Sequence, residues 1–132
     1  MRKRYPIEVS YYRERSSRRK AALMVGIDAD VGSVADRKRE LDDALKRESI
    51  DERKQAEAIV LLVPKRNIET WILCLVGDKV DEETDYKRRQ NIQPLIERAA
   101  GKFYEWSRPN YSVPDHCIPS LKEGFIETHR LD

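Results

Sequence analysis

Two aspartates that end an apolar run are the residues of this sequence best placed to do chemistry. Residues 23–30 read Leu-Met-Val-Gly-Ile-Asp-Ala-Asp, so a stretch typical of a buried strand closes on Asp28 and Asp30. Two positions apart on a strand, their side chains are expected on the same side. In parallel α/β sheets, ligands bind at the carboxyl ends of the strands. Paired carboxylates there repel each other unless a cation lies between them, and such hard oxygen ligands suit Mg²⁺ or Mn²⁺.

A second apolar run, at residues 58–63, is followed at residues 64–71 by Pro-Lys-Arg-Asn-Ile-Glu-Thr-Trp. If the two runs are neighbouring parallel strands, this junction lies beside the two aspartates. Glu69 is then a candidate third metal ligand or a residue that orients water, and Arg66 and Lys65 are candidates to bind phosphate. Carboxylates for Mg²⁺ together with cations for phosphate are what metal-assisted phosphoryl chemistry requires. In the alternative interpretation, Glu69 complements a helix dipole and Arg66 forms a structural ion pair with one of the aspartates.

The elements that would position these residues follow from periodicity and capping signals. Continuous apolar runs predict buried strands at 21–27 and 58–63, whereas residues 6–12 fit either an edge strand or the start of a helix through Arg18. Helices are expected over residues 33–48, from residue 66 to a stop at Gly77, over 92–104 and from Pro119 to residue 130. This order predicts an α/β fold, a βαβ core with a small parallel sheet flanked by helices, in a single domain of residues 1–132.

Each expected helix has a predicted buried face. The first should begin at Ser33, with Asp36 in the capping-box position. The residues predicted to be buried are Val34, Leu41, Ala44 and Leu45 in the first helix, Ile68, Trp71, Ile72 and Leu75 in the second, and Ile92, Leu95, Ile96 and Ala99 in the third. Residues 78–90, acidic and then basic, are expected to form an exposed loop. Two secure strands make a thin sheet, which suggests a partner chain, a second copy, or a shortened version of a larger fold.

Charge is distributed unevenly along the 132 residues. The formal net charge is only +2, but residues 1–20 hold eight lysines and arginines against two glutamates, a net charge of +6. A basic segment that also carries three tyrosines is a candidate to bind nucleic acid, or it is simply a solvated terminus. The sequence lacks an apolar run long enough to span a membrane and a signal-peptide pattern, and Cys74 and Cys117 lie far apart in sequence. These features are typical of a cytoplasmic protein with reduced thiols.

Other reactive residue types give weaker indications. His116 and Cys117 are adjacent in a proline-rich stretch, but no spacing of base and orienting residue supports a nucleophile there. The sequence contains neither a Walker-type glycine loop nor a GxGxxG motif, so nothing in it indicates nucleotide hydrolysis or dinucleotide chemistry.

The two junctions together resemble the Toprim-like proteins of bacterial mobile elements and phage defence. The resemblance covers roughly residues 20–131 and is most specific at residues 23–30 and 64–71, with residues 118–125 fitting the same group. It implies a parallel sheet flanked by helices and a pair of Mg²⁺-binding aspartates, which match Asp28 and Asp30. Toprim enzymes also use a glutamate after an earlier strand. Neither Glu8 nor Glu14 has that context, so the first βα unit is expected to be missing.

Two functions are therefore expected. The first is a Mg²⁺-dependent protein that processes nucleic acid, most plausibly by phosphodiester cleavage, with metal ligands Asp28, Asp30 and Glu69, phosphate contacts from Arg66 and Lys65, and a basic N-terminus that attracts the nucleic acid. The alternative is a catalytically inactive subunit that binds nucleic acid or protein in a defence or mobile-element complex. A homodimer that covers the sheet edge is a third possibility.

Overall fold

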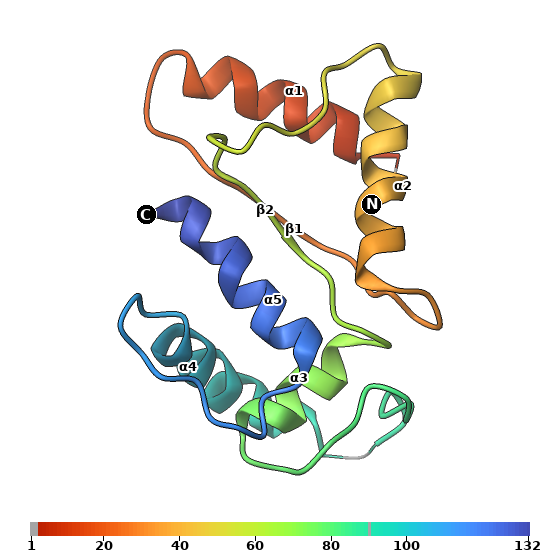
Figure 1. Ribbon diagram of the computed structural model, residues 1–132, viewed down its shortest axis with the longest axis vertical. Helices are drawn as coiled ribbons and strands as arrows, with labels where there is room; N and C mark the ends of the chain where they lie inside the picture. The colour runs from red at the N-terminus through yellow and green to blue at the C-terminus, as the bar shows by residue number, and fades with distance from the viewer. Residues whose placement is uncertain (1–2, 90) are drawn as a thin grey trace.

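The computed structural model describes residues 3–89 and 91–132, so Arg2, one of the N-terminal cations, lies outside the described residues. The chain forms a mixed α/β fold with a small parallel sheet, as predicted (Figure 1). In chain order its elements are α1 (Tyr5–Ser16), β1 (Leu23–Gly26), α2 (Val34–Arg47), β2 (Ile59–Leu62), α3 (Ile68–Leu75), the 3₁₀ helix η1 (Gln93–Leu95), α4 (Ile96–Trp106), α5 (Pro119–Thr128) and the 3₁₀ helix η2 (His129–Leu131).

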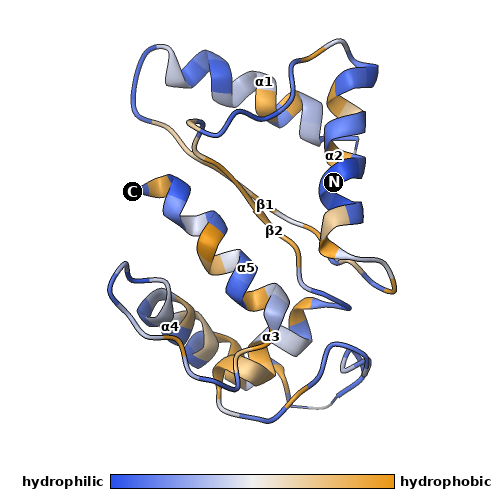
Figure 2. Ribbon diagram, in the orientation of Figure 1, coloured by the Kyte–Doolittle hydropathy of each residue, from blue (hydrophilic) through white to orange (hydrophobic). Residues whose placement is uncertain are grey.

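The sheet consists of β1 and β2, which pair in parallel from Leu23 opposite Ile59 to Gly26 opposite Leu62. Alternate residues of the two strands face opposite layers. Val25, Ile59 and Leu61 pack with α1 and α2 in one apolar cluster, and a second cluster joins α3, α4 and α5. Figure 1 shows α1 and α2 on one side of the strands and the other three helices on the opposite side. In Figure 2 the strands and α3 are the most hydrophobic segments, as burial between two layers requires.

The segment that the sequence left open, residues 6–12, is helical and belongs to α1. Pro6 stands in the first turn, where its missing N–H costs nothing. Tyr5, Val9 and Tyr12, spaced by four and three residues, are all buried against the sheet. The segment forms a helix because the helical period brings these three side chains to one face. The period of a strand would place them on both faces.

The predicted start of α2 is confirmed at atomic detail. The Ser33 side chain accepts a hydrogen bond from the Asp36 N–H at 3.0 Å. Hydrogen bonds from the Ser33 side chain and backbone lower the pKa of Asp36, which completes the capping box. Leu41, Ala44 and Leu45 are buried as expected. This cap fixes the direction in which the chain leaves the end of β1.

The helices of the second layer are joined through Trp71 of α3. Its indole N–H donates to the Ser120 hydroxyl at 2.9 Å, and Gly124 of α5 lies so close that a Cβ atom there would stand 2.8 Å from the Trp71 ring. Two predicted buried positions are wrong: Ile68 is 45% exposed and Ile96 is 41% exposed. Both line an apolar groove between the sheet and α3 and α4, so their side chains face a hollow instead of a neighbouring element.

The predicted helix over 92–104 is shifted toward the C-terminus. Pro94 belongs to the single 3₁₀ turn η1, and the α-helix runs from Ile96 to Trp106. Trp106, the last residue of this helix, lies beyond the predicted end at residue 104 and is buried. The expected loop after α3 is confirmed, since residues 78–89 contain neither helix nor strand.

Candidate functional site

The ends of the two strands lie side by side, as the parallel arrangement predicted. Beyond β1 the backbone continues to pair with the chain that follows β2: the Ile27 N–H donates to the Leu62 carbonyl at 3.1 Å, and the Ala29 N–H donates to the Pro64 carbonyl at 2.8 Å. A last bond joins the Asp30 N–H to the Arg66 carbonyl at 3.0 Å. The two junctions that the sequence singled out therefore form one continuous edge of the molecule.

Asp28 is a carboxylate of this edge whose pKa is shifted by its neighbours. Its side chain is half-buried, and burial is the largest cause that raises its pKa, followed by the negative charges of Glu69 and Asp30. A hydrogen bond from the backbone of Ile68 at the start of α3 and the charge of Lys87 act in the opposite direction. Three carboxylates are thus close enough to influence one another, and a cation among them would relieve the repulsion.

Asp30 departs from the predicted geometry. It lies beyond the strand with a φ of 53°, so the two-residue alternation that would place it on the same side as Asp28 does not extend to it. Its side chain is 65% exposed and forms an ion pair with Arg37 at 3.5 Å. Arg66, its backbone partner, also has a positive φ, of 68°. Asp30 and Arg66 both have a left-handed backbone conformation. The segment after β1 and the segment after β2 therefore turn away from the sheet at neighbouring positions.

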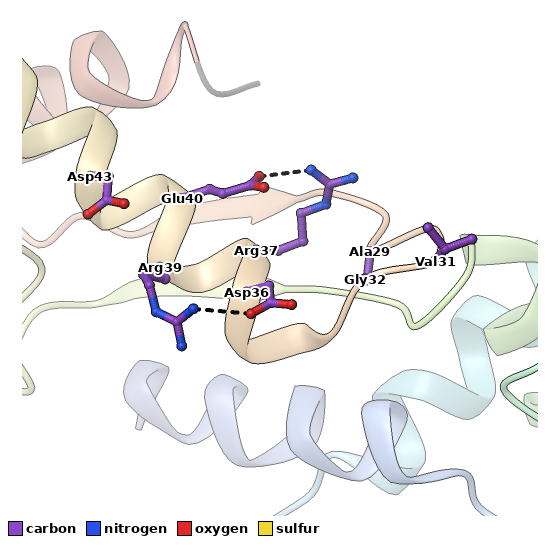
Figure 3. A pocket seen from close by; sticks show the side chains of 8 residues that line it. All are labelled: Ala29, Val31, Gly32, Asp36, Arg37, Arg39, Glu40 and Asp43. Atoms are coloured by element: carbon purple, nitrogen blue, oxygen red, sulfur yellow. Dashed lines mark hydrogen bonds and ion pairs between the residues drawn. The ribbon is translucent and has the colours of Figure 1, made fainter.

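Arg37 is a residue of this edge that the sequence analysis missed. From the first turn of α2 its guanidinium donates to the Asp28 carbonyl at 3.0 Å, reaches the Asp30 carboxylate, and donates to Glu40 at 2.8 Å. It lines a hollow of about 440 Å³ over the loop between β1 and α2, together with other charged side chains. Figure 3 shows these side chains, with Arg39 paired to Asp36. An arginine in a charged helix carries no sequence signal of this role, because its partners are backbone and loop atoms.

The predicted phosphate-binding cations have different surroundings. The Arg66 guanidinium donates two hydrogen bonds to the Glu83 carbonyl, at 3.0 and 2.9 Å, so it holds the 78–89 loop and is not directed at the acids. The buried Asn67 supports the same loop by donating to the Asp85 carboxylate at 2.9 Å. Lys65 is half-buried, and its backbone N–H donates to Ser120. Lys87, from the loop that Arg66 and Asn67 anchor, is the cation that acts on Asp28.

The basic N-terminal segment lies at the other end of the sheet. It leads into the amino end of β1, whereas Asp28 follows the carboxyl end, and Figure 1 shows the loop before β1 and the loop after it at opposite ends of the strands. One of its cations is structural, because Arg13 binds Glu57 at 2.8 Å and also backbone carbonyls of the chain before β2. Arg15, Arg18 and Arg19 are exposed and line a hollow of about 340 Å³. Within one chain, these cations do not adjoin the candidate site.

The carboxylates of this edge, as far as the structure describes the chain, do not form a complete set of metal ligands. Among the residues that the structure describes, no group of three or more His, Cys, Asp or Glu side chains is arranged so that it could hold a metal. Asp28 and Glu69 remain as two carboxylates whose charges interact, and Asp28 lines an apolar groove of about 680 Å³ together with Met24, Ile68 and Trp71. Mg²⁺ keeps several of its waters and is commonly bound by only one or two carboxylates together with substrate phosphates, so this pair fits a partly hydrated ion.

The structure also brings together two thiols that are distant in sequence. Cys74 and Cys117 are both buried, and the neighbouring Cys117 thiol lowers the pKa of Cys74. His116 lies beside them, with Nε2 3.3 Å from the Cys74 carbonyl oxygen. The pair belongs to the second apolar cluster and is not among the residues that line the groove. The spacing of Cys74 and Cys117 along the sequence gives no indication of this contact between α3 and the start of α5.

Comparison with known proteins adds no assignment: no family model, no curated protein and no solved structure matches this chain. Among the helices of residues 3–89 and 91–132, not one combines the length and the hydrophobicity that crossing a bilayer requires.

Proposed function

We propose that this chain is a Toprim-like protein that binds Mg²⁺ or Mn²⁺ at Asp28 and Glu69 and acts on the phosphodiester backbone of a nucleic acid. The observation that carries this proposal is the environment of Asp28. A half-buried carboxylate at the end of a parallel strand has its pKa raised by burial and by two further carboxylates, Glu69 and Asp30. Folding concentrates negative charge there at a cost, which a bound cation would offset.

The chemistry follows from which groups surround the two acids. A bound divalent ion would supply Lewis-acid polarisation of a phosphate and lower the pKa of a bound water. Asp28 and Glu69 would hold the ion, with Asp30 as an outer carboxylate that is already paired with Arg37. Lys87 and Lys65 are the cations of this edge that would contact phosphate oxygens. Arg66 would act indirectly, because it positions the loop that carries Lys87 through the Glu83 carbonyl.

A second candidate function is a non-catalytic subunit that binds nucleic acid or protein. Two observations favour it. No cluster of three metal-binding side chains exists in the part of the chain that the structure describes. In addition, Glu8 and Glu14 both lie in α1, so neither supplies the glutamate that Toprim enzymes use after an earlier strand. If the chain is such a subunit, the acidic edge would be a docking site for its binding partner. The protein would then show no metal-dependent turnover.

The test is a titration of the isotope-labelled protein with Mg²⁺ and Mn²⁺ followed by NMR. We expect saturable changes confined to residues 28–30 and 66–69, which are lost in Asp28→Asn and weakened in Glu69→Gln. Asp43→Asn, which removes an exposed carboxylate from α2, is the matched control and should bind as the wild type does. Metal-dependent cleavage of labelled DNA or RNA by the wild type, absent in Asp28→Asn, would support the first candidate. Metal binding without cleavage would favour the second, and no local binding at millimolar metal would refute the metal site.

A further inference from the structure

One edge of the two-stranded sheet is sealed by side chains. On the outer side of β2, the Leu61 N–H donates to the Glu127 carboxylate at 2.8 Å. The Ile59 carbonyl on the same side accepts from Arg53 at 2.9 Å. Arg53 and Glu127 also pair with each other, so two of the outward backbone groups that another strand would need are already bonded. Another strand could pair at β2 only by breaking these bonds.

The other edge, that of β1, is open. The N–H groups of Leu23 and Ile27 donate toward β2, to the Ala58 and Leu62 carbonyls. Backbone groups of a strand alternate in direction, so those of Met24 and Gly26 point away from β2. In the described ranges neither of these two residues has a hydrogen-bond partner on that outer side. Both are exposed, and Met24 exposes 52% of its surface although it is a large apolar residue in a strand.

The two flanks of this open edge carry opposite charges, so two copies of the edge that run in opposite directions have complementary charges. Arg18, Arg19 and Lys20 precede β1 and are exposed, whereas Asp28 and Asp30 follow it. A second β1 placed in parallel would bring like charges together at both ends. A second β1 placed antiparallel would bring the basic flank of each copy opposite the acidic flank of the other, which stabilises the pairing.

We propose that a second copy of this chain pairs with β1 in the antiparallel direction, which creates a two-fold dimer with a four-stranded sheet. Outward-directed residues must face each other, so Met24 pairs either with Gly26 or with Met24 of the second copy. Counted along the strand, Lys20 falls level with Asp30 in the first register and with Asp28 in the second, and the left-handed turn at Asp30 brings its carboxylate out of the line of β1. A Cβ atom at Gly26 would meet nothing within 4 Å, so the side chain of Met24 from the second copy has room to lie over it.

This pairing also completes the acidic edge. Within one chain, the cations at residues 18–20 and the carboxylates at residues 28 and 30 lie at opposite ends of β1. In the dimer, the cations of one copy lie beside the carboxylates of the other, so each site would receive phosphate-binding charge from its partner. This consequence rests on the proposed function, whereas the dimer itself rests only on the open edge and its flanking charges.

The first experiment measures the mass of the protein in solution by sedimentation over a range of concentrations. The wild type should be a dimer of the 15.5-kDa chain. Met24→Pro removes the outward N–H without removing a bond to β2, so it should be a monomer with an unchanged circular dichroism spectrum. Met24→Val keeps the N–H and should remain a dimer. A wild type that is monomeric at every concentration would overturn the proposal, and so would a folded Met24→Pro variant that still dimerises.

A charge reversal tests the direction of pairing without a proline. Lys20→Glu should weaken dimerisation about tenfold, because each interface contains the interaction twice. Adding Asp30→Lys to Lys20→Glu should restore the dimer if Met24 of one copy faces Gly26 of the other. Adding Asp28→Lys to Lys20→Glu should restore it if Met24 of one copy faces Met24 of the other. Restoration by neither would overturn both of the registers proposed for the antiparallel pairing. These measurements use neither metal nor nucleic acid, so their failure leaves the metal site standing, and a dimer that binds no metal leaves this proposal standing.

Discussion

Asp28 is a residue that folding makes less acidic, which is unusual for a carboxylate near lysines. Burial and the charges of Glu69 and Asp30 raise its pKa above the ordinary value of 3.8. The folded protein therefore holds a proton at this position more tightly than the unfolded chain does. It follows that the free energy of unfolding falls as the pH rises through the range just above 3.8, because the folded state must then carry an unfavourable charge.

Asp28→Asn should consequently stabilise the protein in the absence of divalent metal. The amide keeps the shape of the side chain and can still accept the bond from the Ile68 backbone, while the repulsion by Glu69 disappears. We expect the free energy of unfolding at neutral pH to rise by up to about 1 kcal/mol, measured by urea denaturation. Asp43→Asn, at an exposed position, should change it little. A loss of stability in Asp28→Asn would mean that its charge is needed for folding and would weaken the case for a metal ligand.

At the scale of elements, Glu127 joins α5 to the sheet and to the first layer. Burial opposes its charge, but hydrogen bonds from Arg53, from the Leu61 N–H and from Lys38 together lower its pKa to about 2. The pKa of Glu127 in the folded protein lies below its usual value of 4.5. The ionised side chain therefore contributes its full stabilisation above pH 4.5, and this stabilisation is lost as the pH falls from there toward 2. One side chain thus links α2, β2 and α5, and it also seals the edge of β2.

Glu127→Gln should destabilise the protein strongly. The amide would leave Arg53 without its buried counter-charge, so we expect a loss of about 3 kcal/mol in the free energy of unfolding at neutral pH. The pH dependence of stability between 4.5 and 2 should flatten in the same variant. Glu123→Gln is the control, because Glu123 meets the same Lys38 at 3.5 Å from a half-exposed position and should cost little. Equal effects of the two substitutions would show that the network around Glu127 is not cooperative.

The elements were largely predictable from the sequence because their signals are local. The two strands, the Ser33 cap and the buried faces of α2 and α3 follow from spacing over a few residues. Glu127 and Arg37 were not predictable, since their partners are backbone groups and charges that only the fold brings near. The direction of the Arg66 side chain was not predictable either, because it depends on the position of the loop at residues 78–89, whose Glu83 carbonyl accepts its hydrogen bond. Local patterns therefore predicted that the two strand ends meet, but not which cation acts on Asp28.

At the scale of the whole molecule, two apolar layers share a sheet of only two short strands. The first layer covers the sheet with α1 and α2, and the second surrounds α3, α4 and α5. Such a narrow sheet leaves the groove beside Met24 and Gly26 open on the second layer. If β1 pairs with a second copy, stability must depend on the amount of protein, because folding and association are then linked.

The melting temperature of the wild type should therefore rise with concentration, by roughly 3 °C for each tenfold increase, once the protein is concentrated enough to dimerise. Met24→Pro should melt at a temperature that does not depend on concentration, and Met24→Val should behave as the wild type does. Added salt should reduce the wild-type dependence, because the flanking charges of residues 18–20, Asp28 and Asp30 are exposed or half-buried and are screened. A wild-type melting temperature that is constant at concentrations where sedimentation shows a dimer would mean that the association contributes nothing to the fold. A concentration dependence retained in Met24→Pro would place the interface on a surface other than β1.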